Sequence, residues 1–152
     1  MAIDGTPPFK LPPGAQPIVL NDFDLLTSVQ STAFGASGPY TVPAGKRLVI
    51  SGAYISWVEN SATPPTNGRE ILIQVGSLEA DGHPVAGQVH TIHGVAVPPI
   101  QNAQVTASVT DLALPVPAGA VVLVAITSGV GIVTASTSQI LIVWGWLETT
   151  RG

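Results

Sequence analysis

The chain has 152 residues, of which 45% are hydrophobic and only 9% are charged, with a net charge of −4 and no cysteine. A typical soluble domain is roughly 25% charged, so a deficit of charge is the main compositional feature. The length predicts a single domain, the missing cysteines exclude disulfides and thiol chemistry, and five scattered basic residues argue against a nucleic-acid partner.

The first seventeen residues, MAIDGTPPFKLPPGAQP, contain five of the 14 prolines. Proline fixes φ and favours an extended path, so this segment cannot form a helix. We predict an extended arm over residues 1–17, followed by a folded domain over residues 18–152. Phe9 and Leu11 give the arm apolar side chains, and we expect it to dock on a neighbouring surface.

From residue 18 onward, short runs rich in Val, Ile and Thr alternate with groups of Gly, Pro, Asn and Ser. Such runs predict β-strands, and only residues 22–30 favour a helical turn. The fold class predicted is all-β: an antiparallel, jelly-roll-like sandwich or barrel with an extended N-terminal arm. The predicted strands are Ile18–Leu26, Arg47–Glu59, Glu70–Glu79, Gln88–His93, Gln104–Leu112, Ala120–Thr127, Ile132–Ala135 and Gln139–Glu148.

The tetrapeptide Val-Pro-Ala-Gly occurs twice, at residues 42–45 and 116–119, each time before an apolar run. The residue before a proline is pushed into the β region. We predict that the proline takes the first corner of a turn and that the glycine supplies a permissive backbone. The two units would then launch equivalent strands in the two sheets.

Two late runs, AVVLVAI at 120–126 and ILIVWGWL at 140–147, lack the alternation of a strand with one wet face. We expect both faces to be covered, one by the core and the other by a second subunit or the arm. The surface is poor in charge, which also favours contact between copies. From expected burial, the predicted subunit or capsid contacts are Phe9, Leu11, Ile18, Leu123, Ile140, Val143 and Trp146.

No catalytic or metal-binding motif is present, so no enzyme activity, metal or cofactor is predicted. No G-x-S-x-G elbow occurs. His90 and His93 lie three residues apart, which on a regular strand places them on opposite faces and spoils a shared metal site. No membrane partner is expected, because no run reaches ~18 apolar residues, and no secretory signal is visible.

Two polar, turn-rich loops, residues 60–68 and 97–103, are expected at exposed tips, where β proteins carry binding residues. Trp57, Asn60 and Asn67 are the alternative ligand-binding residues. Trp144 and Trp146 share one face of the last strand, and could either stack on a sugar or fill a core or an interface.

The proline-rich arm, the units TVPAGKRLVI and PVPAGAVVLVAI, and the ending QILIVWGWLE give the chain a resemblance to trimeric capsid decoration, or cement, proteins of tailed bacteriophages, including siphophages of thermophiles. The resemblance implies a thermostable homotrimer that binds the major capsid protein on the virion surface, after synthesis in the host cytoplasm, and clamps neighbouring capsomers. The alternative is a receptor- or carbohydrate-binding β domain of a phage tail fibre or tip.

Overall fold

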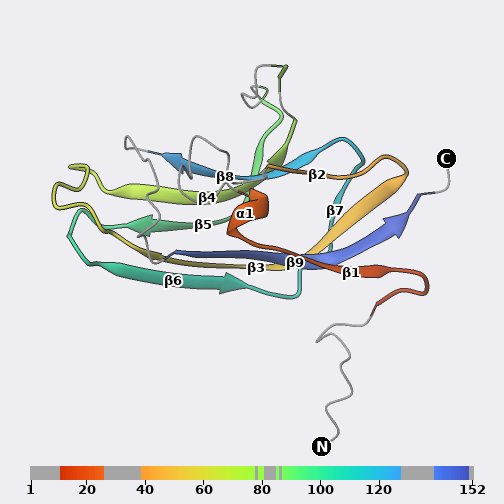
Figure 1. Cartoon of the computed structure of the whole chain (residues 1–152), viewed down its shortest axis with the longest axis horizontal. Helices are drawn as coiled ribbons and strands as arrows, with labels where there is room; N and C mark the ends of the chain where they lie inside the picture. Colours follow the sequence, from red (N-terminus) through yellow and green to blue (C-terminus); the bar gives the residue numbers. More distant parts are fainter. Residues whose placement is uncertain are drawn as a thin grey trace, which may run out of the picture.

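The computed structural model describes residues 11–25, 39–77, 79–80, 85, 87–127 and 139–150. These residues form two antiparallel sheets that pack together (Figure 1), so the prediction of an all-β sandwich is confirmed. Sheet 1 contains β1 (Gln16–Leu20), β9 (Ile140–Thr149), β3 (Lys46–Val58), β6 (Gln104–Val109) and β7 (Leu114–Val116). Sheet 2 contains β2 (Tyr40–Thr41), β8 (Val121–Thr127), β4 (Arg69–Gly76) and β5 (His90–Val97).

The strands pair in a nested order. β1 pairs with β9, β2 with β8, β3 with both β6 and β7, and β4 with β5. Further pairing of β3 with β9 and of β4 with β8 completes the sheets. The first and last observed strands, β1 and β9, therefore lie side by side. Each of the strands β1, β2 and β3 is followed by a strand of the opposite sheet.

The core lies between the sheets and is made of aliphatic side chains from alternate strand positions. On β3, Ile50 and Ile55 are fully buried, as are Ile71 and Ile73 on β4. The single helical turn α1 (Asp22–Leu25) agrees with the turn predicted in residues 22–30 and contributes Leu25 to this core. Burial of each such side chain stabilises the fold by about 1.5–3 kcal/mol, and the core therefore fixes which face of each strand points inward.

Both Val-Pro-Ala-Gly units form turns, but the proline is not at the first corner as predicted. The N–H of Lys46 donates to the carbonyl of Pro43 at 3.1 Å, and that of Ala120 to the carbonyl of Pro117 at 3.2 Å. Each proline is therefore the residue before the corners, and the glycine, with φ of 73° at Gly45 and 84° at Gly119, takes the second corner.

The two turns lead into β3 of sheet 1 and β8 of sheet 2, which agrees with the predicted pair of strands. The valine before each proline, Val42 or Val116, is 1% exposed and belongs to the core. The units also bind each other, since Val42 N–H donates to Ala120 and Gly119 N–H donates to Val42, both at 2.9 Å. The repeated motif thus anchors the same end of both sheets.

Each predicted strand within the described residues overlaps an observed one, and the differences arise at the ends. β1 begins and ends earlier than Ile18–Leu26, and neither β2 nor β7 was predicted. The predicted strand Gln104–Leu112 stops at Val109, because Asp111 has a φ of 59° that ends an extended run, and β7 then resumes pairing with β3. The predicted strand Ile132–Ala135 and most of the predicted arm lie outside the described residues.

Candidate functional site

The outer face of sheet 1 is the candidate site, and β9 supplies its central row. Burial alternates along this strand: Leu141 and Val143 are buried and point into the core, whereas Ile142, Trp144 and Trp146 are only partly buried. Ile140, at the start of the row, is 47% exposed. Trp144 and Trp146 therefore share one face, as predicted, and that face points away from the core.

Neighbouring strands continue this apolar face on both sides of β9. Val19 of β1, which is 64% exposed, lies opposite Trp144 in the antiparallel register. On β3, Gly52 lies opposite Trp144 and Tyr54 opposite Ile142. A Cβ atom on Gly52 would come within 2.2 Å of Trp144 Cζ2, so the missing side chain makes room for the indole ring.

The register of β3 shifts between Ile50 and Gly52, which marks a β-bulge. Because of the extra residue, Ile50 and Ala53 both point into the core although they are three positions apart. The bulge keeps Gly52 and Tyr54 on the outer face with β9. Without the bulge, side chains would alternate regularly along all of β3, and the core residues of one half of the strand would point outward.

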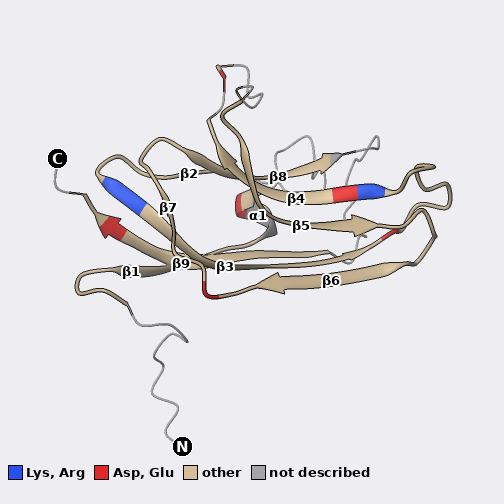
Figure 2. Cartoon of the chain, turned by 180° about the vertical axis from the view of Figure 1, so that it is seen from behind, with Lys and Arg blue, Asp and Glu red and all other residues tan. Residues whose placement is uncertain are grey.

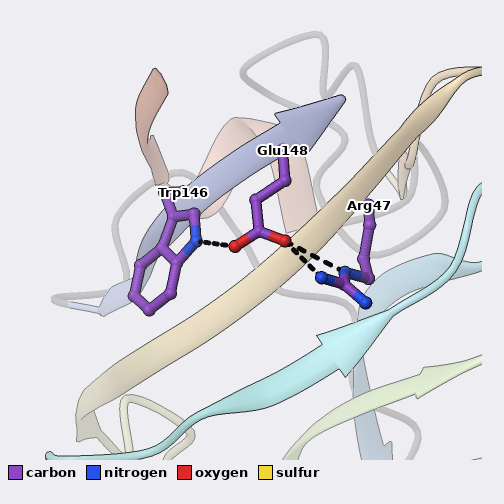
Figure 3. A network of polar contacts seen from close by, with 3 residues as sticks. All are labelled: Arg47, Trp146 and Glu148. Carbon is purple, nitrogen blue, oxygen red and sulfur yellow. Dashed lines mark hydrogen bonds and ion pairs between the residues drawn. The ribbon is translucent and has the colours of Figure 1, made fainter. Parts of the chain in front are cut away.

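A polar cluster closes one end of the face (Figure 3). Trp146 Nε1 donates to Glu148 Oε1 at 2.7 Å, and Arg47 Nε donates to Glu148 Oε2 at 3.1 Å, with a second bond from the Arg47 guanidinium to the same oxygen. The hydrogen bond from Trp146, and then that from Arg47, hold the pKa of Glu148 below its ordinary value. The indole of Trp146 is thereby fixed by its N–H.

Charged residues of the described part of the chain gather at strand ends and in connections, and the middle of each sheet carries none (Figure 2). On the outer face of sheet 1, the only ion pair between described residues joins Arg47 and Glu148. Toward β6 the face becomes polar without charge, since Gln104, Thr106 and Ser108 are exposed there. The outer face of sheet 1 therefore has an apolar centre, an uncharged polar side along β6, and one ion pair, in which the charges of Arg47 and Glu148 compensate each other.

The two predicted tip loops lie at one end of the sandwich, and Glu59, which directly precedes the first loop, forms hydrogen bonds with the second. Glu59 N–H donates to the carbonyl of Ala103 at 2.9 Å, and Asn102 N–H donates to the carbonyl of Glu59 at 2.7 Å. The Glu59 carboxylate accepts from Arg69 Nε at 2.7 Å and from Ser61 N–H at 3.0 Å. Both charged side chains are largely buried, at 3% exposure for Glu59 and 12% for Arg69, so this pair fixes the tip.

The six predicted contact residues that the structure describes fall into three groups in the single chain. Ile140 is exposed and Trp146 partly buried, both on the outer face of sheet 1. Leu11 and Ile18 are partly buried, whereas Leu123 and Val143 are 5% and 1% exposed. Phe9 lies outside the described residues.

The alternative ligand-binding residues are also divided. Asn60 and Asn67 are exposed in the tip loop, but Trp57 is 4% exposed and packs in the core. Sequence reasoning missed Val19 and Ile100 as exposed apolar residues, and it missed Ile142 as a partly buried member of the outward row on β9. The spacing of two residues between Ile140, Ile142, Trp144 and Trp146 was a signal for Ile142.

We expected both faces of the two late apolar runs to be covered, and the single chain covers both faces of β8 but only one face of β9. On β8, both Leu123 and Val124 are buried although they point in opposite directions, so both faces are covered within the single chain. On β9 the outward row stays partly accessible. The apolar surface left for a partner therefore lies on β9 and its neighbours rather than on β8.

A β-bulge also changes the placement of the histidines. His90 pairs with Val75 and His93 with Ile73, two residues apart on β4, so both histidines lie on the same face, contrary to the prediction. His93 Nε2 lies 3.1 Å from the carbonyl oxygen of Ala107 on β6. Within the described residues, no group of three or more His, Cys, Asp or Glu side chains could hold a metal ion.

Comparison with known proteins returns no match to a family model, a curated protein or a solved structure. None of the helices in the described ranges has the length and hydrophobicity needed to cross a membrane.

Proposed function

We propose that the protein is a structural virion protein that binds the outside of a phage capsid as a homotrimer and clamps neighbouring capsomers. The observation that supports this most directly is the apolar, nearly uncharged outer face of sheet 1 on a chain that is only 9% charged. In this proposal the face binds the major capsid protein.

The residues of the face are those that contribute most to protein–protein binding. Interfaces have an apolar centre and a polar rim, and the same order runs from Val19 and Trp144 to Thr106 and Ser108 on β6. Trp, Tyr and Arg carry much of the binding energy in known interfaces. Here Trp146 is held by Glu148, so little side-chain entropy is lost when a partner covers the ring.

The nested strand pairing supports the finer fold assignment. Pairing of the first strand with the last, and so on inward, is the order expected for a jelly roll, an architecture found in viral capsid and lectin domains. We therefore propose a jelly roll with the N-terminal arm as a separate element. In the proposed assembly, the arm of each subunit adds contacts to a sister subunit or to the shell.

A receptor- or carbohydrate-binding role in a tail fibre is the alternative. It calls for exposed aromatic rings to stack on sugars. Trp57, at 4% exposure, offers no such surface beside Asn60 and Asn67. Trp144 and Trp146 on the outer face are the remaining candidates, and the apolar neighbours of Trp144, Val19 and Ile142, favour a protein partner.

Cosedimentation with empty shells, assembled from the capsid protein of the same genome, tests the proposal. Val19→Asp and Ile140→Asp place a charge on exposed apolar positions, where the fold tolerates it, and each is expected to weaken shell binding at least tenfold. Thr106→Asp adds the same charge on the polar side of the same face and serves as the control. Absence of shell binding by the unaltered trimer, or equal binding by all three variants, would overturn the proposal.

A further inference from the structure

One exposed apolar side chain projects from the tip of the sandwich. Ile100, in the connection between β5 and β6, is 62% exposed and follows two exposed prolines, Pro98 and Pro99. The N–H of Ile100 donates to the carbonyl of Pro98 at 2.8 Å, and the carbonyl of Ile100 accepts from Ala103 at 3.1 Å. Two consecutive turns therefore fix the backbone on both sides of Ile100, whose side chain remains exposed.

The backbone around Ile100 is fixed from below. Asn102, a non-glycine residue with a φ of 66°, is held by its hydrogen bond to the carbonyl of Glu59. A residue in this left-handed region persists only where its surroundings impose it, and the buried Glu59–Arg69 pair provides that support. A fixed loop loses little entropy on binding, so an exposed isoleucine on it is a suitable anchor for a partner.

A cleft of about 460 Å³ opens at the other end of the sandwich, between the start of β5 and β7. Its floor is aliphatic, with Val116 buried and Val75, Ile92 and Leu114 partly buried. The volume lies within the roughly 300–1,000 Å³ typical of ligand sites. The rim is polar and exposed, and is formed in part by Gln88, His90 and Thr91.

The lining of the cleft limits what it can bind. Among the described residues that line it there is no Asp, Glu, Lys or Arg to pair with a charged ligand, and no Phe, Tyr or Trp ring on which a sugar could stack. The ligand that fits this lining is an aliphatic side chain of a peptide segment whose backbone can approach the polar rim. Ile100, an isoleucine between two prolines and Gln101, has this chemistry.

We propose that Ile100 of one copy inserts into the cleft of a second copy. The two sites cannot meet within one chain, because β5 runs from His90 at the cleft to Val97 beside the tip, a span of about 23 Å for seven steps. Contact of unlike surfaces on two copies is heterologous, and such contacts close into rings when the rotation allows. This inference rests on the proposed homotrimer and assigns its subunit contact, which leaves the outer face of sheet 1 for the shell.

Cysteine cross-linking tests the contact, because the natural chain contains no cysteine. Full-length Ile100→Cys is mixed with full-length Thr91→Cys, which carries the thiol on the rim, and the mixture is oxidised. A disulfide needs Cα atoms within about 7 Å, so a cross-linked pair is expected in this mixture. Ser108→Cys, exposed on the outer face of sheet 1, replaces Thr91→Cys in the control and should give at least tenfold slower cross-linking.

Sedimentation of uncross-linked variants gives a second readout. Ile100→Asp would place an unpaired charge in an aliphatic cleft and is expected to raise the dissociation constant of self-association at least tenfold. Asn67→Asp adds the same charge to the neighbouring exposed loop and should leave that constant unchanged. Equal cross-linking with Ser108→Cys, or unaltered association of Ile100→Asp, would overturn the proposed contact.

These results separate this inference from the proposed function. A protein that forms a trimer, yet gives neither the cross-link nor the Ile100→Asp effect, would retain the proposed function but use another contact. A cross-link in a protein that forms dimers or open chains would support the contact and remove the homotrimer.

Discussion

Replacement of Arg69 by methionine tests how strongly the buried ion pair fixes the tip of the sandwich. In the native chain, Arg69 Nε donates to Glu59 Oε2 at 2.7 Å, and Glu59 is only 3% exposed. Methionine keeps most of the aliphatic length of arginine but removes the cation and its donors. The carboxylate would then stay buried, with Ser61 N–H as the contact that remains to its other oxygen.

Removal of one partner of a buried pair costs about 3–5 kcal/mol, because the other charge is left uncompensated. Arg69 keeps 12% exposure, and water can partly replace it, so we expect the lower limit, about 3 kcal/mol. Glu59→Gln should cost less, about 1.5 kcal/mol, because the amide oxygen can still accept from Ser61 and the guanidinium is nearer to solvent.

Urea unfolding measures these losses, and all variants are compared at the same protomer concentration because self-association makes the apparent stability depend on concentration. For a chain of this size, a loss of 3 kcal/mol corresponds to a fall in Tm of about 6–12 °C. The matched control is Arg47→Met, which breaks the Arg47–Glu148 pair, where Arg47 is 49% exposed. If Arg69→Met destabilises no more than Arg47→Met, burial does not strengthen the pair and the reasoning is wrong.

Three further changes probe the β9 region. Leu141→Ala, at a fully buried position, should lower the free energy of unfolding by about 2–5 kcal/mol in urea unfolding, whereas Ile140→Ala, at 47% exposure, should change it far less. Gly145→Ala should prevent or greatly weaken folding, as judged by circular dichroism, because its Cβ would lie 1.9 Å from the carbonyl oxygen of Val49. Since the pKa of Glu148 is lowered in the folded chain, its stabilising contribution is fully present above the ordinary value of about 4.3 and is lost as the pH falls through the lowered value. The loss of stability in Glu148→Gln, relative to the native protein, should therefore be larger at pH 7 than at pH 3, and an equal loss at both values would contradict the assignment.

The sequence by itself determined the class of fold and most of the strands. Val-, Ile- and Thr-rich runs between groups of Gly and Pro act locally, through backbone sterics and period-two burial, so β3, β6, β8 and β9 could be placed within a few residues. The spacing of two residues in a predicted strand also placed Trp144 and Trp146 on one face. The conformation of Gly45 and Gly119 followed from turn chemistry, although the corner taken by the proline did not.

Tertiary structure alone decided which apolar residues are left exposed. Leu123 and Ile140 look alike in sequence, yet one is buried and the other half-exposed, because burial depends on which strands and connections cover each sheet face. The bulges in β3 and β5 shift the side chains that follow them to the opposite face of the strand. The bulge in β5 thereby places His90 and His93 on the same face. The juxtaposition of Glu59 with Arg69, which supports Ile100 at the tip, likewise depends on contacts between strands that no local pattern records.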